Sequence, residues 1–150
     1  MLAAALAVLA GARTFEALGF TPCELCLAER IAWYAGVALA ALAAFSASRS
    51  APGIARALFA LLALVFLGNV ALAAYHVGVE QHWWPGPTAC TGALTGPVNA
   101  SDLLASLNAV RVVNCDVVQL RILWISLAGW DVVASLGLAL YAALAARFER

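Results

Sequence analysis

The stretch IARALFALLALVFLGNVALAAYHV, residues 54–77, contains one charged residue, Arg56, and is long enough to cross the hydrocarbon core of a bilayer as a helix. Three further apolar blocks of comparable length cover about residues 2–20, 22–46 and 121–146. Long apolar blocks are typical of transmembrane helices, whereas a soluble helix shows a narrower apolar stripe. The sequence therefore predicts an all-α membrane protein, a single domain over residues 1–150 built as a four-transmembrane-helix bundle.

The composition supports a membrane location. Of the 150 residues, 65% are hydrophobic and 11% are charged, whereas soluble domains contain about a quarter charged residues. The net charge is zero and no basic run is present, which argues against a nucleic-acid partner. The first block lacks the basic lead-in and the small-residue cleavage site of a signal peptide, so we expect a retained helix there.

The connections between the apolar blocks differ in length. Residues 46–53 form a short polar turn, whereas about forty residues, 78–120, separate the third block from the fourth, which predicts a functional loop. The basic residues beside the short turn and at the carboxyl terminus are Arg49, Arg56, Arg147 and Arg150. Because basic residues favour the cytoplasmic side, we expect both termini in the cytoplasm and all four cysteines on the oxidising side.

The long loop carries two predicted local features. Trp83 and Trp84 directly follow a helix end, which is typical of an interfacial anchor, and docking to a partner protein is the alternative. Residues 101–107 predict a capped short helix with an apolar side, which would lie on the membrane surface or pack on the loop.

A close cysteine pair coincides with a helix start. Thr21-Pro22-Cys23-Glu24 fits a capping box, with Thr21 at the N-cap, Pro22 at the first helical position and Glu24 at the third. Cys23 and Cys26 would then lie near the amino end of the helix, where free N–H groups and the helix dipole favour a thiolate.

Two charges follow the cysteine pair inside the same apolar block. Glu29 and Arg30 would lie about 10 Å down the helix, where charges are costly and usually face a functional cavity. Arg30 follows Cys26 by four residues, so it shares a helix face with that thiol. The alternative is that the two charges reach the interface or pair with Arg13 and Glu16.

Other polar residues in the apolar blocks have separate expected roles. His76, near the outer end of its block, could line the same cavity, although a lone histidine is more often a hydrogen-bonded interfacial residue. Asn69 and Asp131 predict polar contacts between helices.

The cysteines form one close pair, Cys23 and Cys26, and one distant pair, Cys90 and Cys115. Two such pairs on one membrane face could exchange when a thiolate attacks a neighbouring disulfide. The pair nearer the bilayer could pass electrons to a lipid-soluble quinone, and the loop pair could meet a soluble partner. Four cysteines permit three pairings, and the sequence leaves the pairing open.

Several motifs occur together along nearly the whole chain. They are Cys23-x-x-Cys26-x-x-Glu29-Arg30, Tyr75-His76-x-Gly78-Val79-Glu80-x-x-Trp83-Trp84-x-Gly86-Pro87 up to Cys90, Cys115-Asp116 and Ser126-Leu127-Ala128-Gly129-Trp130. In this order they resemble the disulfide bond formation protein B (DsbB) family. The resemblance implies a four-helix bundle of the bacterial inner membrane that reoxidises DsbA, a periplasmic thioredoxin-fold oxidant.

The resemblance also implies a role for each cysteine. Cys90 would form the mixed disulfide with the reduced partner, and Cys115 would be its loop mate and exchange with Cys23. Cys26 would face the quinone, either ubiquinone or menaquinone.

Three further residues would surround the quinone in such a family member. Arg30 would stabilise the Cys26 thiolate and the developing quinone anion. His76 matches the quinone-side histidine of the family, and Glu29 would orient Arg30.

Three alternatives remain at the level of sequence. The relay could run backwards as a quinol-driven reductase resembling the vitamin K epoxide reductase group, although that group has the two cysteine pairs in the opposite order. Zinc could bind Cys23 and Cys26 together with Cys90, Cys115, His76 or His82, but the spacing is open and Arg30 would repel a cation. Two static disulfides would leave the buried charges unexplained.

Overall fold

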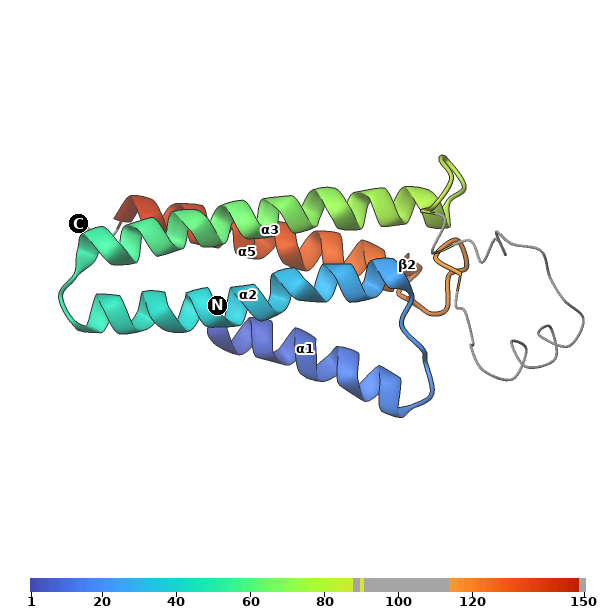
Figure 1. The fold of residues 1–150 in the computed structure, drawn as a ribbon, viewed down its shortest axis with the longest axis horizontal. Helices are drawn as coiled ribbons and strands as arrows, with labels where there is room; N and C mark the ends of the chain where they lie inside the picture. The colour runs from blue at the N-terminus through green and yellow to red at the C-terminus, as the bar shows by residue number, and fades with distance from the viewer. Residues whose placement is uncertain (88–89, 91–113, 149–150) are drawn as a thin grey trace, which may run out of the picture.

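The computed structural model describes residues 1–87, 90 and 114–148. These residues are mainly helical and form a bundle of four long helices (Figure 1). The helices are α1 (Leu2–Ala17), α2 (Glu24–Ser48), α3 (Pro52–Glu80) and α5 (Leu127–Phe148). A short antiparallel hairpin of β1 (Arg121–Ile122) and β2 (Ile125–Ser126) precedes α5. The end of α1, the start of α2, the end of α3 and the start of α5 lie at the same end of the bundle (Figure 1).

Three of the helices are long and apolar enough to cross a membrane. The most apolar 18-residue windows of α2, α3 and α5 have mean hydropathies of 1.6, 2.4 and 1.6. The fourth, α1, has 16 residues and is shorter than the predicted block 2–20. It ends there because the chain turns at Gly19, whose φ of +96° is a conformation that glycine adopts without steric cost.

The start of α5 differs from the sequence prediction. The predicted helix over 121–146 begins only at Leu127, because the preceding residues form the hairpin. Leu123 and Trp124 occupy its two-residue turn with φ of 51° and 65°, as a tight turn with two left-handed residues requires. Ser126 then caps α5, since its Oγ accepts the Gly129 N–H at 3.1 Å.

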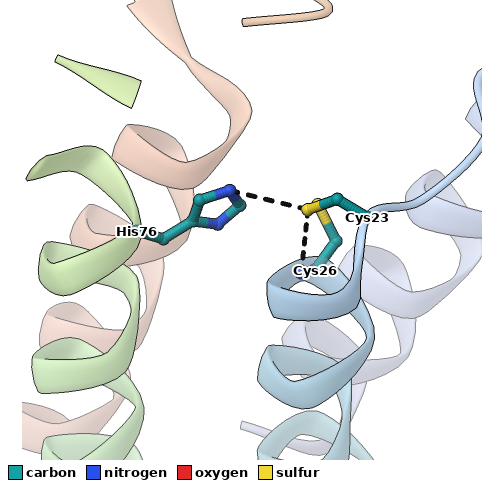
Figure 2. Close-up of side chains that lie close together, drawn as sticks. All are labelled: Cys23, Cys26 and His76. Carbon is teal, nitrogen blue, oxygen red and sulfur yellow. Dashed lines mark hydrogen bonds between the residues drawn. The ribbon is translucent and has the colours of Figure 1, made fainter. Parts of the chain in front are cut away.

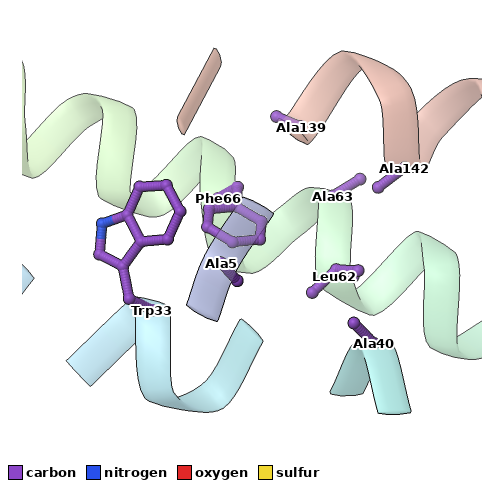
Figure 3. Close-up of a cluster of buried hydrophobic side chains, with 8 residues drawn as sticks. All are labelled: Ala5, Trp33, Ala40, Leu62, Ala63, Phe66, Ala139 and Ala142. Atoms are coloured by element: carbon purple, nitrogen blue, oxygen red, sulfur yellow. The ribbon is translucent and has the colours of Figure 1, made fainter. Parts of the chain in front are cut away.

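The apolar core joins α2, α3 and α5, with Ala5 contributed by α1 (Figure 3). The rings of Trp33 and Phe66 pack edge to face with centroids 5.1 Å apart. Gly36 lets this packing form, because a Cβ there would lie 2.7 Å from Cζ of Phe66. Ala139 is also buried in this cluster, and small residues of this kind let membrane helices approach closely.

A polar network crosses the same three helices. Asp131 of α5 accepts hydrogen bonds from Trp33 Nε1 at 2.7 Å and from Asn69 Nδ2 at 3.0 Å. Asn69 Nδ2 also donates to Ser135 Oγ at 2.9 Å. The predicted role of Asn69 and Asp131 as polar contacts between helices is therefore confirmed. The network fixes α2, α3 and α5 relative to one another.

Candidate redox site

The cysteine pair begins α2, but not through the predicted capping box. Cys23 itself is the N-cap residue, and its Sγ accepts the backbone N–H of Cys26 at 3.3 Å. Thr21 and Pro22 precede the helix in the link from α1, where the Thr21 carbonyl accepts a hydrogen bond from Gln119 Nε2 at 2.9 Å. The capping-box prediction was wrong because the helix begins two residues later, with Cys23 as its N-cap: the Cys23 sulfur binds the N–H of Cys26, whereas the Thr21 hydroxyl was expected to bind the N–H of Glu24.

The two sulfurs of this pair lie close together. Their separation is 2.8 Å, compared with about 2.05 Å in a disulfide. Cys23 is buried and Cys26 is half-buried. A hydrogen bond from the Cys26 thiol, assisted by backbone N–H groups of the first helical turn, lowers the pKa of Cys23 against the opposing effect of burial. The helix start thus favours an ionised sulfur at Cys23, just before the membrane-spanning segment.

His76 of α3 faces the cysteine pair across the bundle (Figure 2). Its Nε2 lies 3.6 Å from Cys23 Sγ, and its Nδ1 lies 2.7 Å from Oε1 of Glu29. Both His76 and Glu29 are buried. The expectation that Glu29 orients Arg30 is therefore wrong: the carboxylate points across to α3 and orients the histidine.

Arg30 has a different partner, which lies on α1. Its Nη1 forms an ion pair with Oε1 of Glu16, and the other oxygen of Glu16 lies 3.1 Å from Nη1 of Arg13. The pairing of Arg30 with Glu16, one of the alternatives that the sequence left open, is the one that the structure adopts. The sequence does contain a signal for this role of Glu16, since it is a charge inside an apolar block.

A cavity of about 490 Å³ opens beside the cysteine pair. Its walls come from all four helices and from residues 117–122, and most of the lining is apolar. The predicted residues Cys23, Cys26, Glu29, Arg30 and His76 all line it. An apolar cavity of this size with a few convergent polar groups is typical of a site for a small lipophilic molecule.

The second cysteine pair lies next to the first. Cys90 and Cys115 form a disulfide with their Cα atoms 5.2 Å apart, and both are buried. They belong to the same apolar cluster as Cys23, Leu25 and Val79. The structure thus brings all four cysteines to one end of the bundle. The short helix predicted over 101–107 lies outside the described residues.

The two adjacent tryptophans have different surroundings. Trp84 stacks on Tyr75 with ring centroids 5.9 Å apart, and its Nε1 donates to the Tyr75 carbonyl at 2.9 Å. This ring packs over Gly78, where a Cβ would lie 2.0 Å from Cζ2 of Trp84. Trp83 is 69% exposed. Trp84 therefore holds the beginning of the loop against the end of α3.

The comparisons with known proteins point to one family. The family model described as disulfide bond formation protein DsbB matches residues 1–145. No curated protein and no solved structure matches the chain. The matched region contains α1, α2, α3, all but the last three residues of α5, the cavity and both cysteine pairs. The chain therefore belongs to the DsbB family of all-α membrane thiol oxidoreductases that act in disulfide bond formation.

Proposed function

We propose that the protein reoxidises a DsbA-like periplasmic thioredoxin-fold protein and passes the electrons through its two cysteine pairs to a membrane quinone, ubiquinone or menaquinone. One observation carries this proposal: Cys23 and Cys26 line an apolar cavity of about 490 Å³ and also belong to or pack against the cluster that contains the Cys90–Cys115 disulfide. A thiol pair in this position borders both a lipophilic site and a second redox pair.

The first steps are thiol–disulfide exchanges. A thiolate of the reduced partner attacks Cys90, the Cys90–Cys115 bond breaks, and Cys115 leaves as a thiolate. The second thiol of the partner then displaces Cys90, so the partner leaves oxidised and the loop pair holds two electrons. Cys115 next attacks Cys23 of an oxidised Cys23–Cys26 pair, and Cys26 leaves as the thiolate. Attack by Cys90 on Cys115 restores the loop disulfide and leaves Cys23 and Cys26 reduced.

A quinone bound in the cavity would accept the two electrons and two protons of the reduced pair. Cys26 and the apolar walls would border it, and Arg30 would supply positive charge where negative charge develops. Glu16 holds the guanidinium in the wall of the cavity. The apolar cavity with these few polar groups suits the size and polarity of a quinone head group, which has two carbonyl oxygens on an apolar ring.

His76 is placed to move the proton of the thiol. Its Nε2 lies 3.6 Å from Cys23 Sγ, and Glu29 on the opposite nitrogen stabilises the protonated ring. A base held in this way accepts the proton that Cys23 loses when it ionises, before the disulfide forms.

The membrane topology is part of the proposal. We place residues 1–150 as one transmembrane domain in the bacterial inner membrane, with both termini in the cytoplasm and the four cysteines on the periplasmic side. The arginines at the opposite end of the bundle, Arg49, Arg56 and Arg147, support this orientation. Disulfides also persist on that side of the membrane and are rare in the cytosol.

The test uses the full-length protein in detergent, reduced and kept without oxygen. Free thiols are counted before and after addition of a soluble ubiquinone or menaquinone analogue, and then with a reduced thioredoxin-fold oxidant present in excess. We expect the thiols of both proteins to disappear with the quinone added. Thiols that persist on that timescale would refute the relay and would favour cysteines that merely brace the periplasmic end.

A further inference from the structure

The reduced cysteine pair and His76 form a cluster of three metal-ligating atoms. The sulfurs of Cys23 and Cys26 and a ring nitrogen of His76 all lie within 4.8 Å of one another (Figure 2). We propose that the reduced protein binds one Zn²⁺ ion, a thiophilic divalent cation, at Cys23, Cys26 and His76, and that the bound ion inhibits the relay. The inhibitory part rests on the proposed function, because the ion would occupy both sulfurs that the relay uses.

The distances are close to those of a tetrahedral zinc site. Zinc bonds of about 2.3 Å to sulfur and about 2.0 Å to nitrogen place neighbouring ligands roughly 3.5–3.8 Å apart. The 3.6 Å between His76 Nε2 and Cys23 Sγ already matches this spacing. The sulfurs, 2.8 Å apart, would have to separate by about 1 Å. Rotation of the Cys26 side chain at the first turn of α2 provides that movement.

Glu29 supplies the support that a zinc-bound histidine usually has. Metal-binding histidines commonly donate their second ring N–H to a carboxylate, which fixes the tautomer and the ring orientation. Glu29 Oε1 lies 2.7 Å from His76 Nδ1, and it is buried. The lone pair of Nε2 then points toward the two sulfurs, which is the orientation that a metal ion requires.

The charges around the site also favour a cation. Arg30, which would repel a metal ion if it were unpaired, forms an ion pair with Glu16. The same cavity wall includes Glu29, Glu80 and Asp131. Carboxylates therefore outnumber guanidinium groups in the wall.

Glu80 lines the same cavity wall as the three ligands. It follows His76 by four residues, so it lies on the same face of α3. Its buried Oε2 has no hydrogen-bond partner in the part of the chain that the structure describes. A buried carboxylate oxygen without a partner is unfavourable, and a bound cation would satisfy it. The fourth zinc ligand is then a water molecule in the cavity, or this carboxylate after its side chain moves toward the cluster of Cys23, Cys26 and His76.

Metal binding here involves no electron transfer. Two thiols bind Zn²⁺ as thiolates and release two protons to the solvent. The oxidised pair has no thiolate to offer, so only the reduced state should bind. Zinc would consequently hold the protein in its reduced state until a chelator removes the ion.

The test uses the full-length Cys90→Ser/Cys115→Ser variant in detergent, in which Cys23 and Cys26 are the remaining cysteines. After reduction by a phosphine and removal of the reductant, Co²⁺ is titrated without oxygen, and Zn²⁺ is then added as competitor. We expect one Co²⁺ per protein with the visible spectrum of a tetrahedral ion bound to thiolates, and complete displacement by Zn²⁺. Oxidised protein should show no such spectrum.

Matched histidine variants separate the site from adventitious binding. His76→Ala should weaken Co²⁺ binding at least tenfold, whereas His82→Ala, which changes the exposed second histidine of the chain, should leave it unchanged. Glu29→Gln should weaken binding about tenfold through loss of the carboxylate that orients the histidine, and it provides the test if His76→Ala does not fold. Equal affinity in His76→Ala and His82→Ala, or no tetrahedral spectrum in reduced protein, would overturn the inference.

The proposed metal site and the proposed relay can be refuted independently of each other. Protein with all four cysteines that is oxidised by a quinone analogue, while the reduced variant binds no Co²⁺, would retain the relay and exclude the metal site. Protein that binds Co²⁺ but keeps its thiols in the presence of quinone would show the reverse. When the metal site and the relay are both present, micromolar Zn²⁺ should slow the loss of thiols caused by quinone, and a chelator should restore the original rate.

Discussion

Glu29 of α2 hydrogen-bonds His76 of α3 across the bundle, with 2.7 Å between Oε1 and Nδ1. The pair is buried, and the other ring nitrogen of the histidine faces Cys23. A carboxylate that would be costly at this depth thereby gains a partner that also contacts the Cys23 thiol. The contact links the charge inside the membrane helix to the cysteine pair at its start.

Replacement of Glu29 tests this link. Glu29→Gln keeps the shape of the side chain but removes the charge that stabilises a protonated His76, so we expect at least tenfold slower oxidation of the reduced pair by quinone. The pH dependence of that rate should also change. Glu24→Gln is the control, because Glu24 lies exposed on the same helix. Equal rates in the two variants would exclude His76 from proton transfer.

Replacement of Arg30 tests the electrostatic role of the guanidinium. Arg30→Ala should raise the KM for quinone about tenfold or more, because a preorganised charge at the cavity wall is lost, while the protein still folds. Glu16→Gln should have a smaller effect in the same direction, since it only releases the guanidinium. Arg56→Ala, an exposed arginine of α3, is the control. An unchanged KM in Arg30→Ala would remove this residue from the site.

The order of the relay can be tested with single cysteine variants. Cys26→Ser should abolish quinone reduction, because the pair beside the cavity can no longer form a disulfide. Cys90→Ser should abolish electron transfer from the reduced partner but leave direct oxidation of Cys23 and Cys26 by quinone intact. Separate assays of the two half-reactions distinguish these outcomes. Similar residual rates for both variants in both assays would contradict the proposed order.

The lowered pKa of Cys23 predicts a specific pH dependence. The thiolate is the reactive form, so a lowered pKa shifts the alkylation profile of Cys23 to lower pH and keeps the rate high until the pH falls through that pKa. The hydrogen bond from Cys26 is the main cause. In a background without the loop cysteines, Cys26→Ala should therefore move the profile to higher pH, whereas Cys26→Ser, which retains a hydroxyl donor, should move it less. If Cys26→Ala shows the same alkylation profile as the parent protein, the hydrogen bond from Cys26 is not the cause of the lowered pKa of Cys23.

The packing of Trp84 on α3 predicts a local change in stability. A methyl group at Gly78 would collide with the indole of Trp84, so Gly78→Ala should destabilise the protein by about 1–3 kcal/mol. Gly68→Ala is the matched control on the same helix, because a Cβ at Gly68 would meet no atom of another described segment within 4 Å, and it should be neutral or slightly stabilising. Thermal unfolding followed by tryptophan fluorescence measures both. Equal Tm values would contradict the proposed packing.

The apolar blocks predicted the helices well because hydrophobic length is a local property of the chain. The ends of the helices were less predictable. Cys23 caps α2 in place of Thr21, and the hairpin delays the start of α5 to Leu127. In both places, contacts outside the helix hold the residues that precede it: Gln119 hydrogen-bonds the Thr21 carbonyl, and β1 pairs with β2.

The membrane helices, the cysteine pair at a helix start and the costly charges near it could all be recognised from the order of residues, because each depends on local composition and spacing. The partners of these charges could not be recognised from the sequence. Glu29 pairs with His76, and Arg30 pairs with Glu16. These pairings depend on the direction in which each side chain leaves its helix, which decides a partner only once the neighbouring helix is in place. Packing of the helices also joined Cys90 to Cys115 beside Cys23 and formed the apolar cavity, because residues far apart in the sequence meet only when the bundle assembles.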